Sequence, residues 1–200
     1  MSSEIKTTNI LHPSSSSNNL VLASDGNVSI TNTLSAGTLG SSVVFPTGHT
    51  IQTLGVIKTD TSLMNTTAAI PGLAVDITPK ITGSKMLIYC TICYARQNAN
   101  SAYPFQIFRD STQIARPASP QSNQQEGFDA GHSVTGDYST FGTFHHLDTH
   151  GISAETQISY TIKSVHRDSY ATTINKSYND GNHTYTNRGV SSLTIMEIAP

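Results

Sequence analysis

The densest group of metal-ligating side chains in this sequence lies in the stretch FHHLDTHG, which contains His145, His146, Asp148 and His150. Neutral imidazole and carboxylate are good ligands for zinc or iron. Successive side chains of a β-strand point to opposite faces, however, so a strand here would separate His145 from His146. We therefore expect loop histidines and no metal or cofactor, and keep His145, His146 and His150 as the candidate ligands. Near a threefold axis, one histidine per chain would supply three ligands.

The two cysteines, Cys90 and Cys93, form a Cys-X-X-Cys motif, a spacing found in zinc and redox sites. Their surroundings, KMLIYCTICYA, are typical of one strand, in which an offset of three residues places the two side chains on opposite faces. The sequence has no second pair of this spacing to complete a four-ligand zinc site. We expect two buried, reduced thiols.

Acidic residues that could form a catalytic pair stand mainly in turn sequences: Asp25-Gly26, Asp110-Ser111, Asp168-Ser169 and Asp180-Gly181. Turn formation explains these residues, whereas a glycosidase needs two carboxylates held roughly 5–10 Å apart. The sequence also lacks a G-x-S-x-G motif, a phosphate-binding glycine loop and H-E-x-x-H. We predict that the chain is not an enzyme.

Aromatic residues in polar stretches offer a binding surface instead. The segment 117–137 combines proline and glycine with Ser, Asn and Gln, which predicts a long surface loop. Exposed aromatic rings among such residues can stack on a sugar or cover a flat protein surface. We name Tyr103, Phe128 and Tyr138 as the contact residues for a glycan or protein partner, with the nearby histidines beside them.

Composition and periodicity predict an all-β fold. Charged residues make up 12% of the chain, about half of the roughly 25% of an ordinary domain. Short β-branched and aromatic segments, separated by turn residues about every 8–12 positions, predict an antiparallel β-sandwich. A hairpin is expected to turn on Asp110-Ser111. The expected strands after residue 50 are 53–59, 74–78, 85–95, 105–109, 112–116, 139–146, 156–165, 173–178 and 191–198.

The stretch before this domain has apolar pairs and triplets that glycine interrupts every few residues. Strand fragments so short bury too little surface to offset the entropy of ordering them. The stretch therefore either stays disordered or pairs with other copies, and its regular Val, Leu, Ile and Phe favour three chains wound together. We expect a homotrimer with an N-terminal extended arm over 1–17, an intertwined trimeric β stem over 18–50 and a β-sandwich over 51–200.

Charge and hydropathy exclude two classes of partner. The net charge is −2 and no Lys/Arg cluster is present, whereas a nucleic-acid-binding protein needs several cations to displace counterions from phosphates. No basic amphipathic stretch and no apolar segment of signal or membrane-span length is present. We therefore expect synthesis in a cytoplasm, no nucleic acid and no membrane insertion.

Several stretches, taken in order, resemble tail-fibre-like structural proteins of marine tailed bacteriophages. LASDGNVSITNTLSAGTLGSSVVFPTGHTIQ resembles their trimeric shaft and collar. VDITPKITGSKMLIYCTI, FQIFRDSTQIA, HHLDTHGISAETQISYTIK and SSLTIMEIAP resemble their C-terminal domain. The resemblance spans most of residues 18–198, as a series of segments that carry no chemistry.

The resemblance implies a virion component, namely a homotrimeric short fibre or spike with an intertwined β stem and a jelly-roll-like head. The arm would then attach to other virion proteins, and the head would contact a glycan or protein of the host surface. The chain is shorter than a complete tail fibre, which favours a short fibre or a spike. A capsid decoration (cement) protein and a stand-alone carbohydrate-binding module are the alternatives.

Overall fold

The computed structural model describes residues 9–10, 13–14, 20–22, 24, 28–30, 45–98, 104–118, 126–128, 136–166 and 170–200. The chain divides into two compact units, Met1–Val43 and Val44–Pro200. This division falls a few residues before residue 51, where the sequence places the start of the sandwich.

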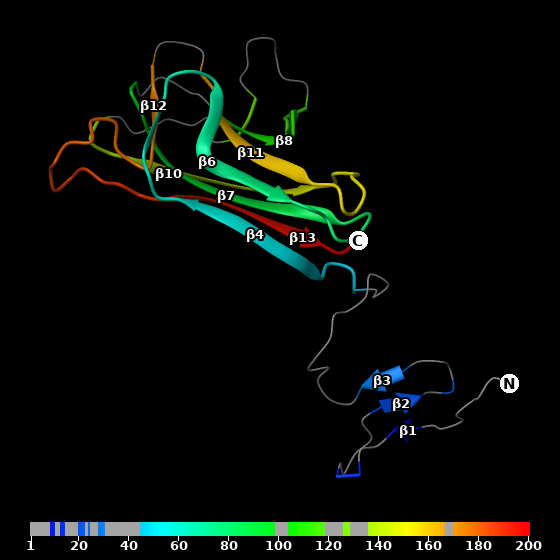
Figure 1. The fold of residues 1–200 in the computed structure, drawn as a ribbon. Coiled ribbons are helices and arrows are strands. Elements are labelled where there is room, and N and C mark those ends of the chain that lie inside the picture. Colours follow the sequence, from blue (N-terminus) through cyan, green and yellow to red (C-terminus); the bar gives the residue numbers. More distant parts are fainter. Residues whose placement is uncertain are drawn as a thin grey trace. The chain divides into compact units, whose positions relative to one another are not determined.

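Three short strands form an antiparallel sheet in the first unit (Figure 1). They are β1 (Asn9–Ile10), β2 (Leu20–Leu22) and β3 (Val28–Ile30), and β2 lies between the other two. Asn9 is opposite Val21, and Leu20 is opposite Ile30. The sheet therefore joins a strand from the segment 1–17 to two strands from the segment 18–50.

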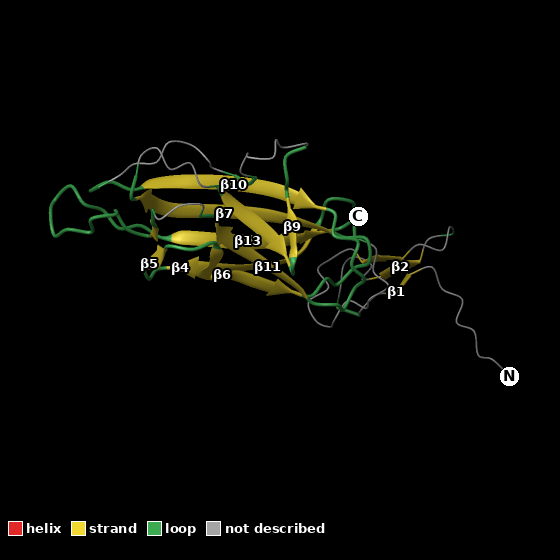
Figure 2. Ribbon diagram, turned by 90° about the horizontal axis from the view of Figure 1, so that it is seen from above, coloured by secondary structure: helices red, strands yellow, loops and turns green. Residues whose placement is uncertain are grey.

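The second unit is a sandwich of two antiparallel sheets (Figures 1 and 2). Its strands are β4 (Thr50–Lys58), β5 (Ser62–Met64), β6 (Ala68–Ile77), β7 (Lys85–Arg96), β8 (Phe105–Arg109), β9 (Thr112–Ile114), β10 (Thr140–Asp148), β11 (Ile158–Ser164), β12 (Thr172–Ile174) and β13 (Ser191–Ile198). The larger sheet has the order β4-β13-β7-β12-β5, and β10 also pairs with β7. The smaller sheet has the order β6-β11-β8-β9. The predicted antiparallel β-sandwich is confirmed.

The core lies between the two sheets because apolar residues alternate along their strands. In β11, Ile158, Tyr160 and Ile162 are buried while the residues between them are half-buried. Met86 and Ile88 of β7 face them from the larger sheet, and both are fully buried. Full burial of a side chain of this size contributes about 1.5–3 kcal/mol, so this alternation supplies most of what holds the sheets together.

The sandwich has two ends, which we call the base and the tip. At the base, β4 begins and β13 ends, with Thr50 opposite Ile198. At the tip, Lys58 is opposite Ser191, and the connection 175–190 and the start of β10 lie there (Figure 1). The chain enters the sandwich from residue 45 at the base. Side chains at the tip are therefore on the end away from that point.

Most of the predicted strands are present, with shifted limits. The hairpin β8–β9 turns on Asp110-Ser111, with Arg109 opposite Thr112, as predicted. β5 was not expected, and β6 begins six residues before the predicted 74–78, because Pro71 and Gly72 interrupt the apolar pattern without ending the strand. β12 ends at Ile174, so most of the predicted 173–178 lies outside it.

The described residues contain no helix. Consequently, none of them forms an apolar helix of the length that a membrane crossing requires.

Candidate functional site

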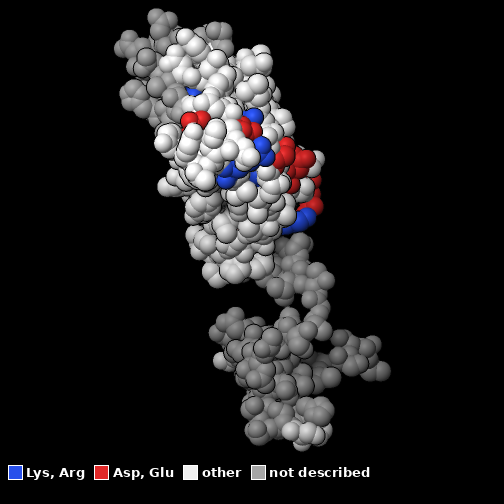
Figure 3. Space-filling view, turned by 90° about the vertical axis from the view of Figure 1, so that its left-hand side faces the viewer, with Lys and Arg blue, Asp and Glu red and all other residues white. Residues whose placement is uncertain are grey.

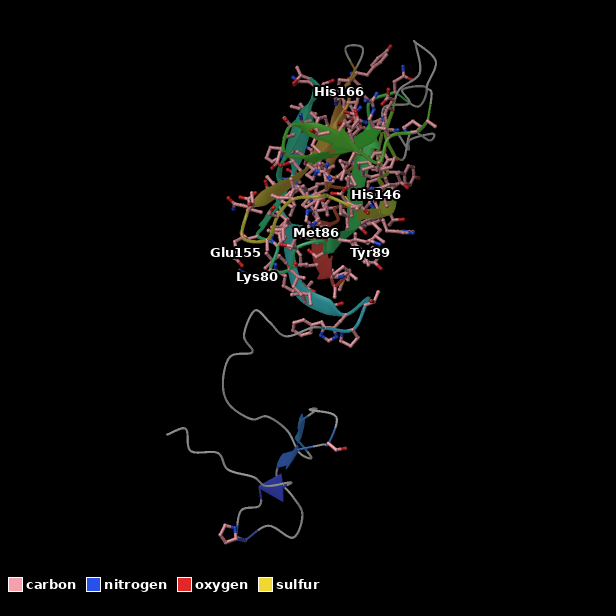
Figure 4. The ribbon with its side chains drawn as sticks, turned by 90° about the vertical axis from the view of Figure 1, so that its right-hand side faces the viewer. Lys80, Met86, Tyr89, His146, Glu155 and His166 are labelled. Atoms are coloured by element: carbon pink, nitrogen blue, oxygen red, sulfur yellow. The ribbon has the colours of Figure 1, made fainter. Side chains whose placement is uncertain are left out.

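The predicted histidine group does not come together in one chain. His145 lies on the outer face of β10, with its ring centroid 6.3 Å from that of Tyr89 on β7. His146, the next residue, is half-buried and lies beside Phe144, at 6.3 Å between ring centroids. Figure 4 labels His146 and Tyr89, which belong to the neighbouring strands β10 and β7. Within the described part of the chain, no three His, Cys, Asp or Glu side chains are placed to hold a metal ion.

Asp148, from the same stretch, ties the two sheets together at the base. Arg109 on β8 donates from Nη1 to both carboxylate oxygens of Asp148, at 2.8 and 2.9 Å. The Tyr160 hydroxyl on β11 donates to Oδ2 at 2.7 Å. Burial, and then the bond to Asp148, raise the pKa of Tyr160. β10 runs through Asp148, two residues beyond the predicted end of this strand at residue 146.

His150 is buried at the base beyond the end of β10. Its Nδ1 accepts a hydrogen bond from the backbone N–H of Ile152 at 3.0 Å. Burial lowers the pKa of His150; the charge of Asp148 opposes this, Arg109 adds to it, and Glu197 opposes it. The side chain of His150 is a structural part of the base.

Cys90 and Cys93 are both buried and free. Cys90 belongs to the core between the sheets, and burial raises its pKa to about 12. Cys93 lies on the other face of β7, where its Sγ is 3.4 Å from Ser139 Oγ. Burial also raises the pKa of Cys93, and Ser139 partly opposes the shift. A thiol with a raised pKa is a poor nucleophile and a poor metal ligand, so both cysteines have packing roles.

The three predicted contact residues have different outcomes. Tyr103 lies outside the described residues. Tyr138 is 59% exposed, as a contact residue must be. Phe128 is only 8% exposed, so its expected position on an exposed surface is wrong. It forms a two-bond bridge with Phe105 (2.8 and 2.9 Å), and its ring stacks on Phe144 at 4.7 Å. Non-local pairing thus draws this residue of a polar loop into the core.

Tyr138 lies at the tip, in a segment that hydrogen bonds attach to the connection 175–190. The Ser139 N–H donates to Asn187 Oδ1 at 3.1 Å, and the Asn179 N–H donates to the Gly136 carbonyl at 2.9 Å. Asn179 also donates from Nδ2 to Asp137 at 3.0 Å. Figure 3 looks at this end and shows acidic and basic side chains close together on its described surface. The tip therefore combines an exposed tyrosine with paired charges such as Asp180 and Arg188.

The outer face of the larger sheet exposes several apolar side chains among uncharged polar ones. Cross-strand partners share a face, so Tyr89 and His145 lie side by side there, as do Leu87 and Leu147. Tyr89 is 48% exposed and Ile57 is 70% exposed. The uncharged residues of this face, which we call the outer sheet face, are Thr53, Gly55, Ile57, Leu87, Tyr89, Thr91, Phe141, Thr143, His145, Leu147, Ser192, Thr194 and Met196.

No protein-family model matches the chain, and the curated proteins include no match to it. Among solved structures, the chain is similar to a structure of infectious bursal disease virus, Gt strain, with a TM-score of 0.39 and 13% sequence identity. The match covers 91% of this chain and 47% of the viral chain. The Gx strain structure gives a TM-score of 0.34 and 14% identity over 82% of this chain and 42% of the other. The chain thus spans less than half the length of either. TM-scores below 0.5 do not establish a common fold.

Proposed function

We propose that this chain is a non-enzymatic structural component of a tailed-phage virion, a homotrimeric short fibre or spike. Residues 1–17 attach it to other virion proteins, and residues 18–50 form the trimeric stem. The sandwich presents its tip to the host surface. The sequence resemblance across residues 18–198 supports the virion role, and an all-β chain with few charges is typical of such components.

The observation that carries self-association is the outer sheet face. Monomeric proteins rarely expose wide contiguous apolar surfaces, and larger ones mark interaction sites. Here Tyr89, Leu87 and Leu147 lie next to one another with threonine and histidine around them, and Lys85 supplies a charge only at the base of the face. A second copy of this chain is the partner that the short strands before residue 45 also require, because they bury little surface alone.

Host contact is assigned to the tip because it lies away from the point at which the chain enters the sandwich. Tyr138 is exposed there, beside the connection 175–190. Three identical weak contacts on one trimer gain strength through effective concentration, even when each alone is weak. A capsid decoration protein is the second candidate, since the same outer sheet face would also build a trimer seated on a capsid.

The self-association is tested by sedimentation equilibrium of the full chain and of a Tyr89→Lys variant. We expect a wild-type trimer and a shift of the variant to monomer, because a buried lysine ammonium without a partner is costly. Thr112→Lys is the matched control, since Thr112 is exposed on β9 of the smaller sheet, and it should remain trimeric. A Tyr89→Lys trimer as stable as wild type would remove the outer sheet face from the interface.

The virion role has its own test in purified particles of the encoding phage. Immunogold labelling with an antibody against the sandwich should mark the tail or the capsid surface. Labelling on the tail supports the fibre, labelling across the capsid supports decoration, and particles free of the chain would overturn both.

A further inference from the structure

We propose that the connection 175–190 at the tip forms a binding site for a neutral saccharide of the host surface. The inference deepens the proposed host contact and rests on it for the identity of the partner. It names a site that includes none of the three contact residues predicted from the sequence.

The connection encloses an open polar hollow of about 440 Å³. Asn182 and Asn187 bring side-chain amides to it, and Asp180 and Arg188 bring a carboxylate and a guanidinium. The Asn182 side chain is exposed and makes no hydrogen bond within the described part of the chain. Asn187 uses Oδ1 to accept from the Ser139 N–H, which leaves its two amide hydrogens as donors. The hollow therefore presents donors and acceptors together.

An aromatic pair stands at the wall of this hollow. The rings of His183 and Tyr185 are stacked, with their centroids 5.0 Å apart and an interplanar angle of 7°. His183 lines the hollow, and Tyr185 is 53% exposed. Gly181 lets the imidazole lie close, because a Cβ there would be 2.8 Å from His183 Cδ2. Of the pair, His183 is therefore the ring that meets the hollow, with Tyr185 stacked behind it, and the imidazole can contact the C–H face of a sugar.

The hollow is held in shape before any ligand arrives. Arg188 donates to both oxygens of Asp180 at 2.9 Å, and Lys176 donates to the same carboxylate at 3.3 Å. Thr186 Oγ1 donates to the Gly181 and His183 carbonyls. Asp180 adopts φ 45°, a left-handed conformation that is uncommon outside glycine and that clusters at ligand sites. Such pre-organisation lowers the entropic cost of binding.

The side chains that line the hollow suit a neutral sugar better than an anion. Hydroxyl groups both donate and accept, and this lining offers amide donors, an amide carbonyl and a carboxylate together. An anionic ligand needs donors, yet Arg188 already has its Nε and one Nη directed at Asp180, whose negative charge also faces the hollow. A neutral pyranose with adjacent hydroxyls, packed against His183, matches both the polar lining and the aromatic pair.

The experiment is titration of the full ¹⁵N-labelled chain with glucose, galactose, mannose, their disaccharides and glucuronate, followed by NMR. We expect saturable shifts of the 180–188 amides with at least one neutral sugar. His183→Ala and Asn182→Ala should each weaken binding about tenfold, through loss of the aromatic surface and of the free amide. Glu155→Gln, an exposed acidic residue paired with Lys80 at the base (Figure 4), should bind as wild type.

Three results would overturn the proposal: no neutral sugar shifts these amides, only glucuronate does, or the two alanine variants bind as wild type. Both substitutions are at exposed positions, and an unchanged spectrum outside the loop shows that each variant is folded. Failure here is distinct from failure of the proposed function. If the chain is a trimer that binds no sugar, only the saccharide site is refuted. If the chain is a monomer that binds sugar, the site stands and the trimeric virion component is refuted.

Discussion

Asp148 connects the two sheets at the residue scale. It accepts from Arg109 and Tyr160, which lie on β8 and β11 of the smaller sheet, while Asp148 ends β10 of the larger one. The side chain of Asp148 is 7% exposed and that of Arg109 is 21% exposed, so water cannot readily replace these partners. The acidic residue of the metal-like stretch FHHLDTHG is therefore part of a structural network.

Removing this carboxylate should be strongly destabilising. Asp148→Ala leaves the Arg109 guanidinium and the Tyr160 hydroxyl without their acceptor, and breaking a mostly buried pair in this way costs about 3–5 kcal/mol. Urea unfolding followed by circular dichroism measures the loss. Glu155→Gln removes a carboxylate from an exposed pair, with 3.6 Å between Lys80 Nζ and Glu155 Oε1, and should leave the midpoint unchanged. An Asp148→Ala midpoint equal to wild type would contradict the role of this network.

Two imidazoles, that of the buried His150 and that of the half-buried His166, should make stability depend on pH. Burial lowers the pKa values of His150 and His166, so the unfolded chain, with pKa about 6.5, takes up protons first as pH falls. The free energy of unfolding should therefore be constant above about pH 7 and decrease from about pH 6.5 towards pH 5. His150→Gln and His166→Gln should each reduce this slope in urea unfolding measured across the range. A slope that neither variant changes would contradict the assignment.

At the scale of elements, Asn175 organises the connection between β12 and β13. Its Nδ2 donates to the Lys58 and Asp60 carbonyls at 2.7 and 2.9 Å, and Ser191 Oγ donates to its Oδ1 at 2.6 Å. Its φ is 63°, a left-handed conformation that asparagine adopts more readily than most residues. A single residue thus joins the ends of β4, β12 and β13 and begins the connection that forms the tip.

Asn175→Ala should lower the free energy of unfolding by about 2–4 kcal/mol. The substitution leaves buried carbonyls and a hydroxyl without a partner and places alanine in a disfavoured conformation. Asn182→Ala, in the same connection but exposed, is the control and should change stability by less than about 0.5 kcal/mol. Equal effects of the two substitutions would show that Asn175 does not organise this connection.

The elements that the sequence predicts well are those with uninterrupted alternation. KMLIYCTICYA indicates β7 almost to its limits because every second residue from Met86 to Ile92 enters the core. The first half of β6 is hidden by Pro71 and Gly72, where the strand continues with Gly72 at φ 79°. Phe128 is hidden for another reason: its pairing with Phe105 is non-local, and its polar neighbours predict exposure.

The hollow at the tip could not be predicted from the sequence either, because it also depends on non-local contacts. Asp180-Gly181 indicates a turn, and that prediction explains the residue without a ligand. The return of Arg188 to Asp180 across eight positions, and the stacking of His183 on Tyr185, depend on how the connection folds. The spacing of Lys176, Asp180 and Arg188 is the one local signal, and charge pairs of this spacing are common on surfaces.

At the scale of the whole molecule, a trimer would cover apolar surfaces that a single chain leaves exposed. The sandwich has its own core, whereas its outer sheet face has apolar residues without a covering layer in one described chain. The short strands β1, β2 and β3 have the same need, since a sheet of this size is marginal in water. Association into a trimer would give both units a partner surface.

The most direct measurement is the solution mass of the full chain by light scattering, at several protein concentrations. We expect a trimer, with three times the 21.4 kDa mass of one chain. The mass should be independent of concentration over the range of the experiment. A mass of 21.4 kDa at every concentration would contradict trimerisation, because no copy of the chain would then cover the outer sheet face.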